Sequence, residues 1–246
     1  MMLATMKRKL FRAKQLFDRQ SLKTSFLVPH ELRHQRLGTD YGGWFIPVGL
    51  FNASSLCYCF GAGEDISFDV EMIKRFGCQV FTFDPTPRAL AYVRNLMANE
   101  TDAKNLRFYD FGVWRENSMM KFFAPRNEAH VSHSILNLQD TADGFEAQCY
   151  TLQSIMVKLE HTSVDLIKLD IEGAEYAVLG HMIETGIRPS VICVEFDEGP
   201  NPKDGAYIDR IGASISRLGD YGYVVTHMDF WNFTFVLKDI VHDSAA

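Results

Sequence analysis

The sequence predicts an α/β fold in which a doubly wound, mostly parallel sheet is covered by helices on both faces. Three features of the chain lead to this prediction. Short apolar segments alternate with segments of helical spacing from residue 55 onward. Val164–Leu169 is apolar at four of its six positions, as expected for a parallel strand that is buried on both faces. The last helical segment is followed by two strand-like segments, Tyr223–Thr226 and Asn232–Leu237, which predict a terminal antiparallel hairpin.

The first four elements have the clearest patterns. Ser55–Phe60 is a short apolar run that ends at a glycine, which predicts the first strand. Ile66–Phe76 places its apolar residues at helical spacing, and Gly77 ends that helix. Gln79–Phe83 is rich in residues that favour strands and predicts the second strand. Pro87–Met97 predicts a helix, because proline suits the first helical turn.

The second half of the chain continues the alternation after an interruption. Leu106–Tyr109 predicts the third strand. The stretches Gly112–Ala124 and Gly144–Leu152 read as a β-rich excursion from the sheet. Val164–Leu169 then predicts the fourth strand. The remaining elements before the hairpin are a helix, a fifth strand and a helix, at Ala174–Thr185, Ser190–Phe196 and Tyr207–Leu218.

Length and composition suit one large α/β domain or two small ones. The chain has 246 residues, 47% of them apolar, which is enough for a sizeable core. We expect a basic N-terminal arm or helix at residues 1–36 and a single domain at residues 37–246, with an insertion of strands and loops around residues 112–150. The formal net charge of −6 argues against nucleic acid as a partner, since nucleic-acid binding relies on attraction to phosphate.

Charge is unevenly distributed along the chain. Residues 1–36 hold nine basic and two acidic side chains, so the arm carries a net charge of +7 and the remainder carries −13. Two interpretations of the arm remain open. It forms a helix that packs on the domain through Leu10, Leu16 and Phe17, or it makes peripheral contact with an anionic membrane or reaches over the substrate.

Neither a membrane span nor a secretory signal is indicated by the sequence. Runs of about eighteen apolar residues, which a span requires, do not occur. The first residues lack the apolar core and cleavage site of a signal peptide. The five cysteines are odd in number and mostly lie in apolar, strand-like runs, which indicates reduced thiols in the core. We therefore expect a cytoplasmic protein.

The first functional motif is the loop Phe60-Gly61-Ala62-Gly63-Glu64-Asp65 after the first strand. Glycine lets a backbone turn sharply and approach a ligand closely, although a tight strand-to-helix turn would need the same residues. Asp84 follows the second strand, 23 residues beyond Gly61, where an acid can accept hydrogen bonds from both ribose hydroxyls of an adenosine. Together these residues predict a Rossmann-like site for an adenosine cofactor.

Details of this loop disfavour a nicotinamide dinucleotide as that cofactor. The dinucleotide fingerprint requires a small residue at its sixth position, where this chain has Ile66. Glu64 and Asp65 would repel a pyrophosphate, whereas they suit the cationic ammonium and sulfonium groups of a methionyl cofactor.

The third motif spans Asp165–Glu175, where a buried strand ends in three acids around a Gly-Ala helix start. The helix dipole favours acids such as Glu172 and Glu175 at this position, so these two have a purely structural explanation. That explanation does not extend to Asp170 at the end of the strand. Asp170 and Glu172 are therefore predicted to face the cofactor or the substrate.

The stretch Ile167–Glu175 closely resembles the signature of FkbM-type methyltransferases, and Val194-Glu195-Phe196 resembles the acid-bearing strand that follows it in that family. The resemblance covers roughly Tyr41 to Leu237. It implies a class I methyltransferase fold, S-adenosylmethionine as cofactor, and O-methylation of a sugar or another small-molecule hydroxyl, so that the partner is a small-molecule or glycan acceptor. One departure concerns Cys59, because methyltransferases often carry an acid two residues before the first loop glycine.

These motifs define three sets of candidate site residues. The predicted cofactor contacts are Gly61, Ala62, Gly63, Glu64, Asp84, Pro85, Asp110 and Asp170. A neutral hydroxyl is a poor nucleophile and needs a base, for which the predicted residues are Asp170, Glu195 and His133, with Asp197 and His130 as further candidates. The residues expected at the substrate or in a lid are Tyr41, Trp44 and Glu172.

Three questions stay open at this level. Asp170 and Glu195 are expected to end neighbouring strands and so could offer oxygen ligands to a divalent metal, although a metal is not expected. Cys59 suggests the alternative of a cofactor-binding module that is catalytically impaired. A nicotinamide-dependent oxidoreductase is the less favoured alternative.

Overall fold

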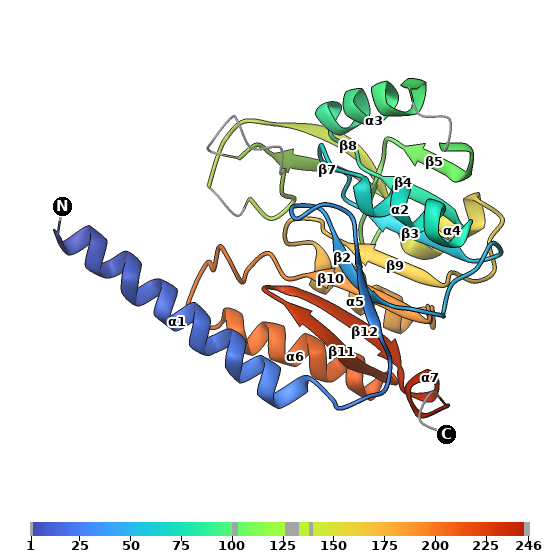
Figure 1. Cartoon of the computed structure of the whole chain (residues 1–246). Coiled ribbons are helices and arrows are strands. Elements are labelled where there is room, and N and C mark those ends of the chain that lie inside the picture. The colour runs from blue at the N-terminus through green and yellow to red at the C-terminus, as the bar shows by residue number, and fades with distance from the viewer. Residues whose placement is uncertain (1, 100–102, 126–132, 138–139, 244–246) are drawn as a thin grey trace.

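The computed structural model describes residues 2–99, 103–125, 133–137 and 140–243. Its centre is a seven-stranded sheet in the order β11-β12-β10-β9-β3-β4-β5 (Figure 1). The strands are β3 (Leu56–Phe60), β4 (Gln79–Phe83), β5 (Leu106–Tyr109), β9 (Leu166–Leu169), β10 (Val191–Glu195), β11 (Tyr223–Asp229) and β12 (Asn232–Leu237). The neighbours from β10 to β5 pair in parallel, and β12 runs antiparallel to both β10 and β11. The predicted mostly parallel sheet with a terminal hairpin is therefore confirmed, and this is the class I methyltransferase fold.

Helices cover both faces of the sheet because successive residues of each strand point to opposite sides. On β3, Tyr58 and Phe60 belong to one apolar core, and Cys57 and Cys59 belong to the other. The first core is closed by α4 (Leu152–Lys158), α5 (Glu175–Glu184) and α6 (Tyr207–Asp220). The second is closed by α2 (Ser67–Phe76), α3 (Pro87–Asn99) and α7 (Lys238–Asp243). A short 3-10 turn, η1 (Ala103–Asn105), leads into β5.

A hairpin that the sequence did not predict precedes the central sheet. It consists of β1 (His34–Leu37) and β2 (Trp44–Pro47), paired antiparallel. The hydroxyl of Thr234 on β12 donates a hydrogen bond of 2.6 Å to the backbone oxygen of Phe45, which ties the hairpin to the sheet. Trp44 is only 2% exposed and lies in the second core. The prediction that Trp44 belongs to a lid is therefore wrong, because its ring is enclosed by the packing of the hairpin.

The excursion around residues 112–150 forms a small sheet of its own. Its strands are β6 (Gly112–Val113), β8 (Gly144–Tyr150) and β7 (Ser118–Phe123), in that spatial order. A minor apolar cluster under this sheet contains Trp114, Phe122 and Cys149. The strands thus place residues of the insertion next to the carboxyl ends of β4 and β5.

The N-terminal arm forms a long helix, α1 (Met2–Phe26), whose N-terminal end projects away from the rest of the molecule (Figure 1). It contacts α6 and β11. Leu10, Leu16 and Phe17, which were expected to pack on the domain, are 64%, 59% and 74% exposed. That expectation is wrong because Leu22, which is 5% exposed, lies on a different face of the helix and sets the side that packs.

Two expectations about the interior and the membrane can be compared with the structure. All five cysteines are free and buried, so the prediction of reduced thiols in the core is confirmed. Among the described residues, no helix combines the length and the apolar character that crossing a bilayer would require.

Candidate functional site

A cavity of about 430 Å³ lies at the carboxyl ends of β3, β4, β9 and β10. This is the edge of an open α/β sheet at which ligands usually bind. The loop between β1 and β2 and the turn between β11 and β12 complete its wall. Phe83, Val113, Phe122 and Ile135 give the β4 side of the cavity an apolar lining.

The glycine loop forms the floor of the cavity between β3 and the neighbouring strands. Gly61 has a φ of +90° and Gly63 a φ of +52°, in the region that favours glycine. A Cβ at Gly61 would overlap the backbone oxygen of Asp170, so the ends of β3 and β9 can approach this closely only with glycine at this position. The Gly61 amide donates a hydrogen bond of 3.0 Å to the backbone oxygen of Phe83, which fixes the loop to β4.

Asp84 fastens the same loop from the opposite side. Its Oδ2 accepts hydrogen bonds of 2.9 Å from the backbone amides of both Ala62 and Gly63. Its Oδ1 accepts hydrogen bonds from the Thr86 amide at 2.8 Å and the Thr86 hydroxyl at 2.7 Å. A carboxylate offers about four acceptor positions, and all of them are filled here. Asp84 lines the cavity as predicted, but its position also has a structural role that the sequence did not indicate.

The β1–β2 loop is held over the glycine loop by Asp65. The Asp65 carboxylate accepts hydrogen bonds from the Ser67 amide at 2.8 Å and from the Thr39 hydroxyl. A Cβ at Gly42 would come within 2.7 Å of the Asp65 Cγ, so the loop packs directly on this side chain. Tyr41 at the tip of the loop lines the cavity and is 79% exposed, which places it where a lid residue is expected.

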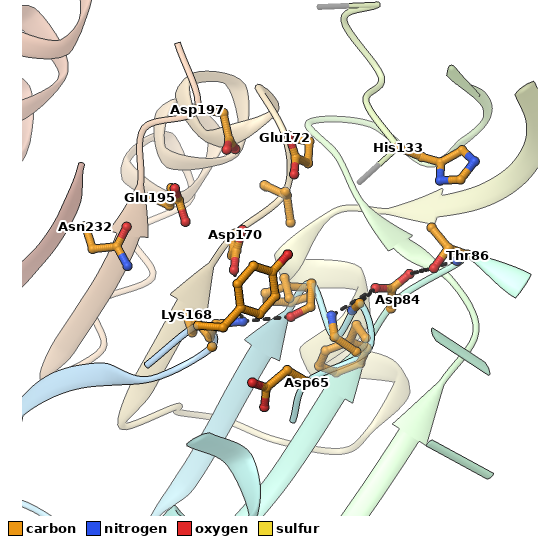
Figure 2. A pocket seen from close by; sticks show the side chains of 18 of the residues that line it. Asp65, Asp84, Thr86, His133, Lys168, Asp170, Glu172, Glu195, Asp197 and Asn232 are labelled. Atoms are coloured by element: carbon orange, nitrogen blue, oxygen red, sulfur yellow. Dashed lines mark hydrogen bonds and ion pairs between the residues drawn. The ribbon is translucent and has the colours of Figure 1, made fainter. Parts of the chain in front are cut away.

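Acidic side chains gather at the β9 and β10 side of the cavity. Figure 2 shows Asp170, Glu172, Glu195 and Asp197 grouped on this side, away from Asp84. Asp170 directly follows β9, and Glu195 is the last residue of β10. Because the carboxyl ends of adjacent parallel strands meet at one edge, residues 25 positions apart in sequence become neighbours.

The crowding of these acids changes their protonation. Burial, together with the nearby carboxylates of Asp170 and Glu172, raises the pKa of Glu195 to about 8. Burial raises the pKa of Glu175, which lies behind the cavity wall, from 4.5 to about 7. The pKa of Asp197 is raised as well, by burial and by the Glu175 carboxyl. Each group resists ionisation because a new negative charge would be poorly solvated and close to other carboxylates.

Lys168 is a site residue that the sequence analysis missed. It is only 3% exposed, yet it lies on β9 beneath the cavity. Its Nζ donates a hydrogen bond of 2.7 Å to the Gly61 backbone oxygen and lies 3.5 Å from Asp170 Oδ2. Although burial opposes its charge, the carboxylates of Asp170 and Asp69 hold the pKa of Lys168 above its usual value. The signal was a charged residue inside an otherwise apolar strand, since such a charge requires a partner.

One set of acids is close enough to share a cation. Asp170, Glu172 and Asp197 each offer a carboxylate oxygen, and these atoms lie within 4.8 Å of one another. Glu195, the predicted partner of Asp170 in a metal site, is not part of this set. Lys168 already places a positive charge beside Asp170, so the cluster has a protein cation as well as protons to offset its charge.

Most of the predicted site residues line the cavity, but two of the predicted cofactor contacts do not. The predicted residues that line it are Tyr41, Gly61, Ala62, Gly63, Asp84, Pro85, His133, Asp170, Glu172 and Glu195. Glu64 is exposed and turns away to an ion pair of 2.8 Å with Arg88, so it does not line the cavity. Asp110 is exposed beyond the end of β5 and does not line it either.

His133 and Cys59 have different surroundings from those that the predictions assumed. His133 lines the cavity, and its ring lies edge-on to Phe145 with 5.2 Å between the ring centres. Cys59 is fully buried, and it faces the core instead of lining the cavity. Of the two acids beside the glycine loop, Glu64 and Asp65, only Asp65 lines the cavity. The further candidate His130 lies outside the described residues.

Comparison with solved structures finds methyltransferases of low sequence identity. One is the methyltransferase FkbM from Methylobacillus flagellatus KT, with 14% identity, a TM-score of 0.48, and coverage of 76% of this chain and 44% of that one. Another is precorrin-6y C5,15-methyltransferase from Geobacter metallireducens GS-15, with 12% identity, a TM-score of 0.40, and coverage of 76% and 82%. A third is the SAH-bound Podospora anserina methyltransferase PaMTH1, with 10% identity, a TM-score of 0.41, and coverage of 75% and 72%. This chain therefore spans less than half the length of the first of these proteins.

No curated protein matches the chain. The family described as Methyltransferase FkbM domain matches residues 58–225, which is more than half of the chain. The matched range contains the glycine loop, Asp84 and the acids that follow β9 and β10. The chain therefore belongs to the FkbM methyltransferase family.

Proposed function

We propose that the chain binds S-adenosylmethionine in this cavity and transfers the methyl group to a hydroxyl group of a sugar or another small molecule. The observation that carries the proposal is the order of the strands along the cavity. The glycine loop of β3 lies between the acids of β9 and β10 on one side and Asp84 of β4 on the other. This order separates an acidic half of the cavity from an apolar half.

The two halves match the two ends of the cofactor. S-adenosylmethionine carries positive charges on its sulfonium and its ammonium, and the acidic half attracts both. Asp170, held in place by Lys168, is the proposed partner of the ammonium. The adenosine then lies on the β4 side, with its ring against apolar walls such as Phe83 and Val113 and its ribose beside Asp84.

The proposed transfer is an in-line displacement in which positioning does much of the work. The acceptor oxygen forms a bond to the methyl carbon while the carbon–sulfur bond breaks, and its electron pair leaves with the neutral thioether of S-adenosylhomocysteine. The hydroxyl proton passes to Glu195. With a pKa near 8, the ionised Glu195 is a stronger base than an ordinary glutamate, and about half of it is ionised at pH 8.

Isothermal titration of the purified chain tests the cofactor first. We expect S-adenosylmethionine and S-adenosylhomocysteine to bind with one site per chain, and NAD not to bind. The absence of heat at millimolar concentrations of either methionyl compound would refute the proposal. Methyl-labelled cofactor incubated with sugars and other hydroxyl compounds then tests the acceptor class, with Glu195→Gln as the inactive control.

The two alternatives predict different results in the same experiments. A catalytically impaired module would bind the cofactor without transferring a methyl group to any acceptor. The buried position of Cys59 weakens this alternative, because its side chain does not line the cavity. A nicotinamide-dependent oxidoreductase would bind NAD instead, which Asp65 beside the glycine loop disfavours because its carboxylate would repel a pyrophosphate.

A further inference from the structure

Among the described residues, three side chains on one face of α1 anchor the helix to the domain. Gln15 Nε2 donates a hydrogen bond of 2.8 Å to the backbone oxygen of Gly199, in the loop that precedes α6. Asp18 accepts a hydrogen bond from the Tyr207 hydroxyl, and Leu22 is buried at 5% exposure. These residues lie three and four positions apart, so they form one side of the helix.

A second apolar stripe follows the side of α1 that faces away from the domain. Met6, Leu10, Ala13 and Phe17 are spaced by four, three and four residues, so their side chains line up along the helix. Met6 is 54% exposed, Leu10 64% and Phe17 74%. We call these four residues the outer stripe. Large apolar side chains aligned in this way on a solvent-facing helix indicate a binding surface.

Basic residues border the outer stripe. Lys9, Arg12, Arg19 and Lys23 share the flank between the outer stripe and the face that packs on the domain, as their spacing of three, seven and four residues requires. The helix contains one acid, Asp18, and that carboxylate is already bonded to Tyr207. The solvent-facing side of α1 is thus both apolar and positively charged, on a chain whose net charge is −6.

This surface continues to the mouth of the cavity. The guanidinium of Arg19 lies 4.6 Å from the centre of the Phe230 ring. Phe230 occupies the turn between β11 and β12, is 68% exposed and lines the cavity. An object bound along α1 would therefore also meet the rim of the candidate site.

We propose that the outer stripe and its basic flank dock α1 on an anionic lipid membrane, with Phe230 and the cavity mouth facing the lipid headgroups. A membrane satisfies both halves of the surface, because apolar side chains enter the acyl boundary while lysines and arginines reach the headgroup phosphates. Nucleic acid supplies phosphates but no apolar layer for the outer stripe. The inference concerns the surface formed by α1 and Phe230 and does not depend on the proposed methyl transfer.

Flotation with lipid vesicles tests the proposal on the whole chain. We expect binding to phosphatidylcholine vesicles that contain about 30% phosphatidylserine and about tenfold weaker binding to pure phosphatidylcholine. Leu10→Ser and Phe17→Ser should each weaken binding about tenfold. The matched control is Val157→Ser, which removes an equally exposed apolar side chain, 73% exposed, from α4. Arg12→Glu should weaken binding, whereas the exposed Lys104→Glu, with the same change in charge, should not.

Insertion of the helix can be read directly with Phe17→Trp. The three native tryptophans are at most 9% exposed, so a new exposed indole adds a signal at longer wavelength. We expect its emission to shift to shorter wavelength when anionic vesicles are added. The proposal is overturned if the chain does not bind these vesicles, or if binding is the same for Leu10→Ser and for Val157→Ser. Concentration-dependent dimers that Leu10→Ser dissolves would also overturn it, because the outer stripe would then be an interface between copies of the chain.

Discussion

Replacing Asp84 with asparagine tests whether this residue fastens the glycine loop, because asparagine keeps the size of the side chain but loses its charge and half of its acceptors. The carboxylate receives four hydrogen bonds, two from the glycine-loop amides of Ala62 and Gly63 and two from Thr86. In Asp84→Asn one oxygen becomes an NH2 group, which is a donor. It must then face either the loop amides or the Thr86 donors, so two charge-assisted hydrogen bonds are lost.

The cost follows from the usual strength of such bonds. A hydrogen bond to a charged acceptor stabilises a protein by about 1.5–3 kcal/mol, so two of them contribute about 3–6 kcal/mol. Asp84 lines the cavity, so water can replace part of the loss, and we expect about 3 kcal/mol. In a chain of this length each kcal/mol lowers the Tm by about 2–4 °C, which gives a decrease of about 6–12 °C.

Thermal unfolding of the cofactor-free chain measures this effect. The control is Asp143→Asn, which removes the same charge from an exposed side chain and should leave the Tm unchanged. If Asp84 acted only on the ribose, Asp84→Asn would weaken the binding of S-adenosylhomocysteine but keep the cofactor-free Tm within about 1 °C of the original. Such a change in Tm is smaller than the change that a loss of about 1 kcal/mol would produce. That result would refute the interpretation of Asp84 as the residue that fastens the loop.

Three further predictions follow from the geometry of the site. For Glu195, with a pKa of about 8, kcat/KM should rise with pH, reach half of its maximum near pH 8 and level off about one pH unit higher. Glu195→Gln should lower methyl transfer by about 10²–10⁴-fold while S-adenosylhomocysteine still binds. The pKa of Glu175 rises from 4.5 in the unfolded chain to about 7 in the folded chain. The unfolded chain therefore releases this proton at a lower pH than the folded chain does, and the free energy of unfolding falls as pH rises between those two values. Glu175→Gln should therefore stabilise the chain by about 1–3 kcal/mol at pH 8 and little at pH 4, which urea unfolding at the two pH values would measure. The new amide of the glutamine can also donate a hydrogen bond to the buried, unpaired Oδ2 of Asp197. A lack of any stabilisation at pH 8 would contradict this account. Gly61→Ala should abolish cofactor binding and destabilise the chain by more than about 3 kcal/mol. The control is Gly186→Ala, which should cost only about 1 kcal/mol, because Gly186 also has a positive φ of +75° but has open space where a Cβ would lie. Equal losses of stability for the two variants in calorimetry would contradict the steric argument.

Local patterns were sufficient for the elements of the central sheet. Gln79–Phe83 and Leu106–Tyr109 form strands with the predicted bounds, because β-favouring runs between turns determine strands locally. Gly77, with a φ of +70°, ends α2 as predicted. The β1–β2 hairpin was missed because its short strands are stabilised by packing against β12 and the second core, and neither contact leaves a local pattern.

For the candidate residues that follow β9 and β10, the position at the cavity is explained by the topology of the sheet. Asp170, Glu172 and Glu195 line one cavity because parallel strands bring their carboxyl ends to the same edge. Residues whose role depends on the direction of a side chain were not predicted. Glu64 pairs with Arg88 outside the cavity, although it is adjacent to the glycine loop in sequence.

The sequence by itself determined the family, the order of strands and helices, and the edge of the sheet where the site lies, because periodicity and motif spacing act over short stretches of chain. Only the tertiary structure decided which charged and polar groups contact one another and which surfaces stay exposed. It placed Lys168 beneath Gly61, filled all four acceptor positions of Asp84, and left the outer stripe of α1 facing solvent. These arrangements depend on contacts between residues that are distant in sequence, and burial and pairing, which set their energies, exist only once the chain has folded.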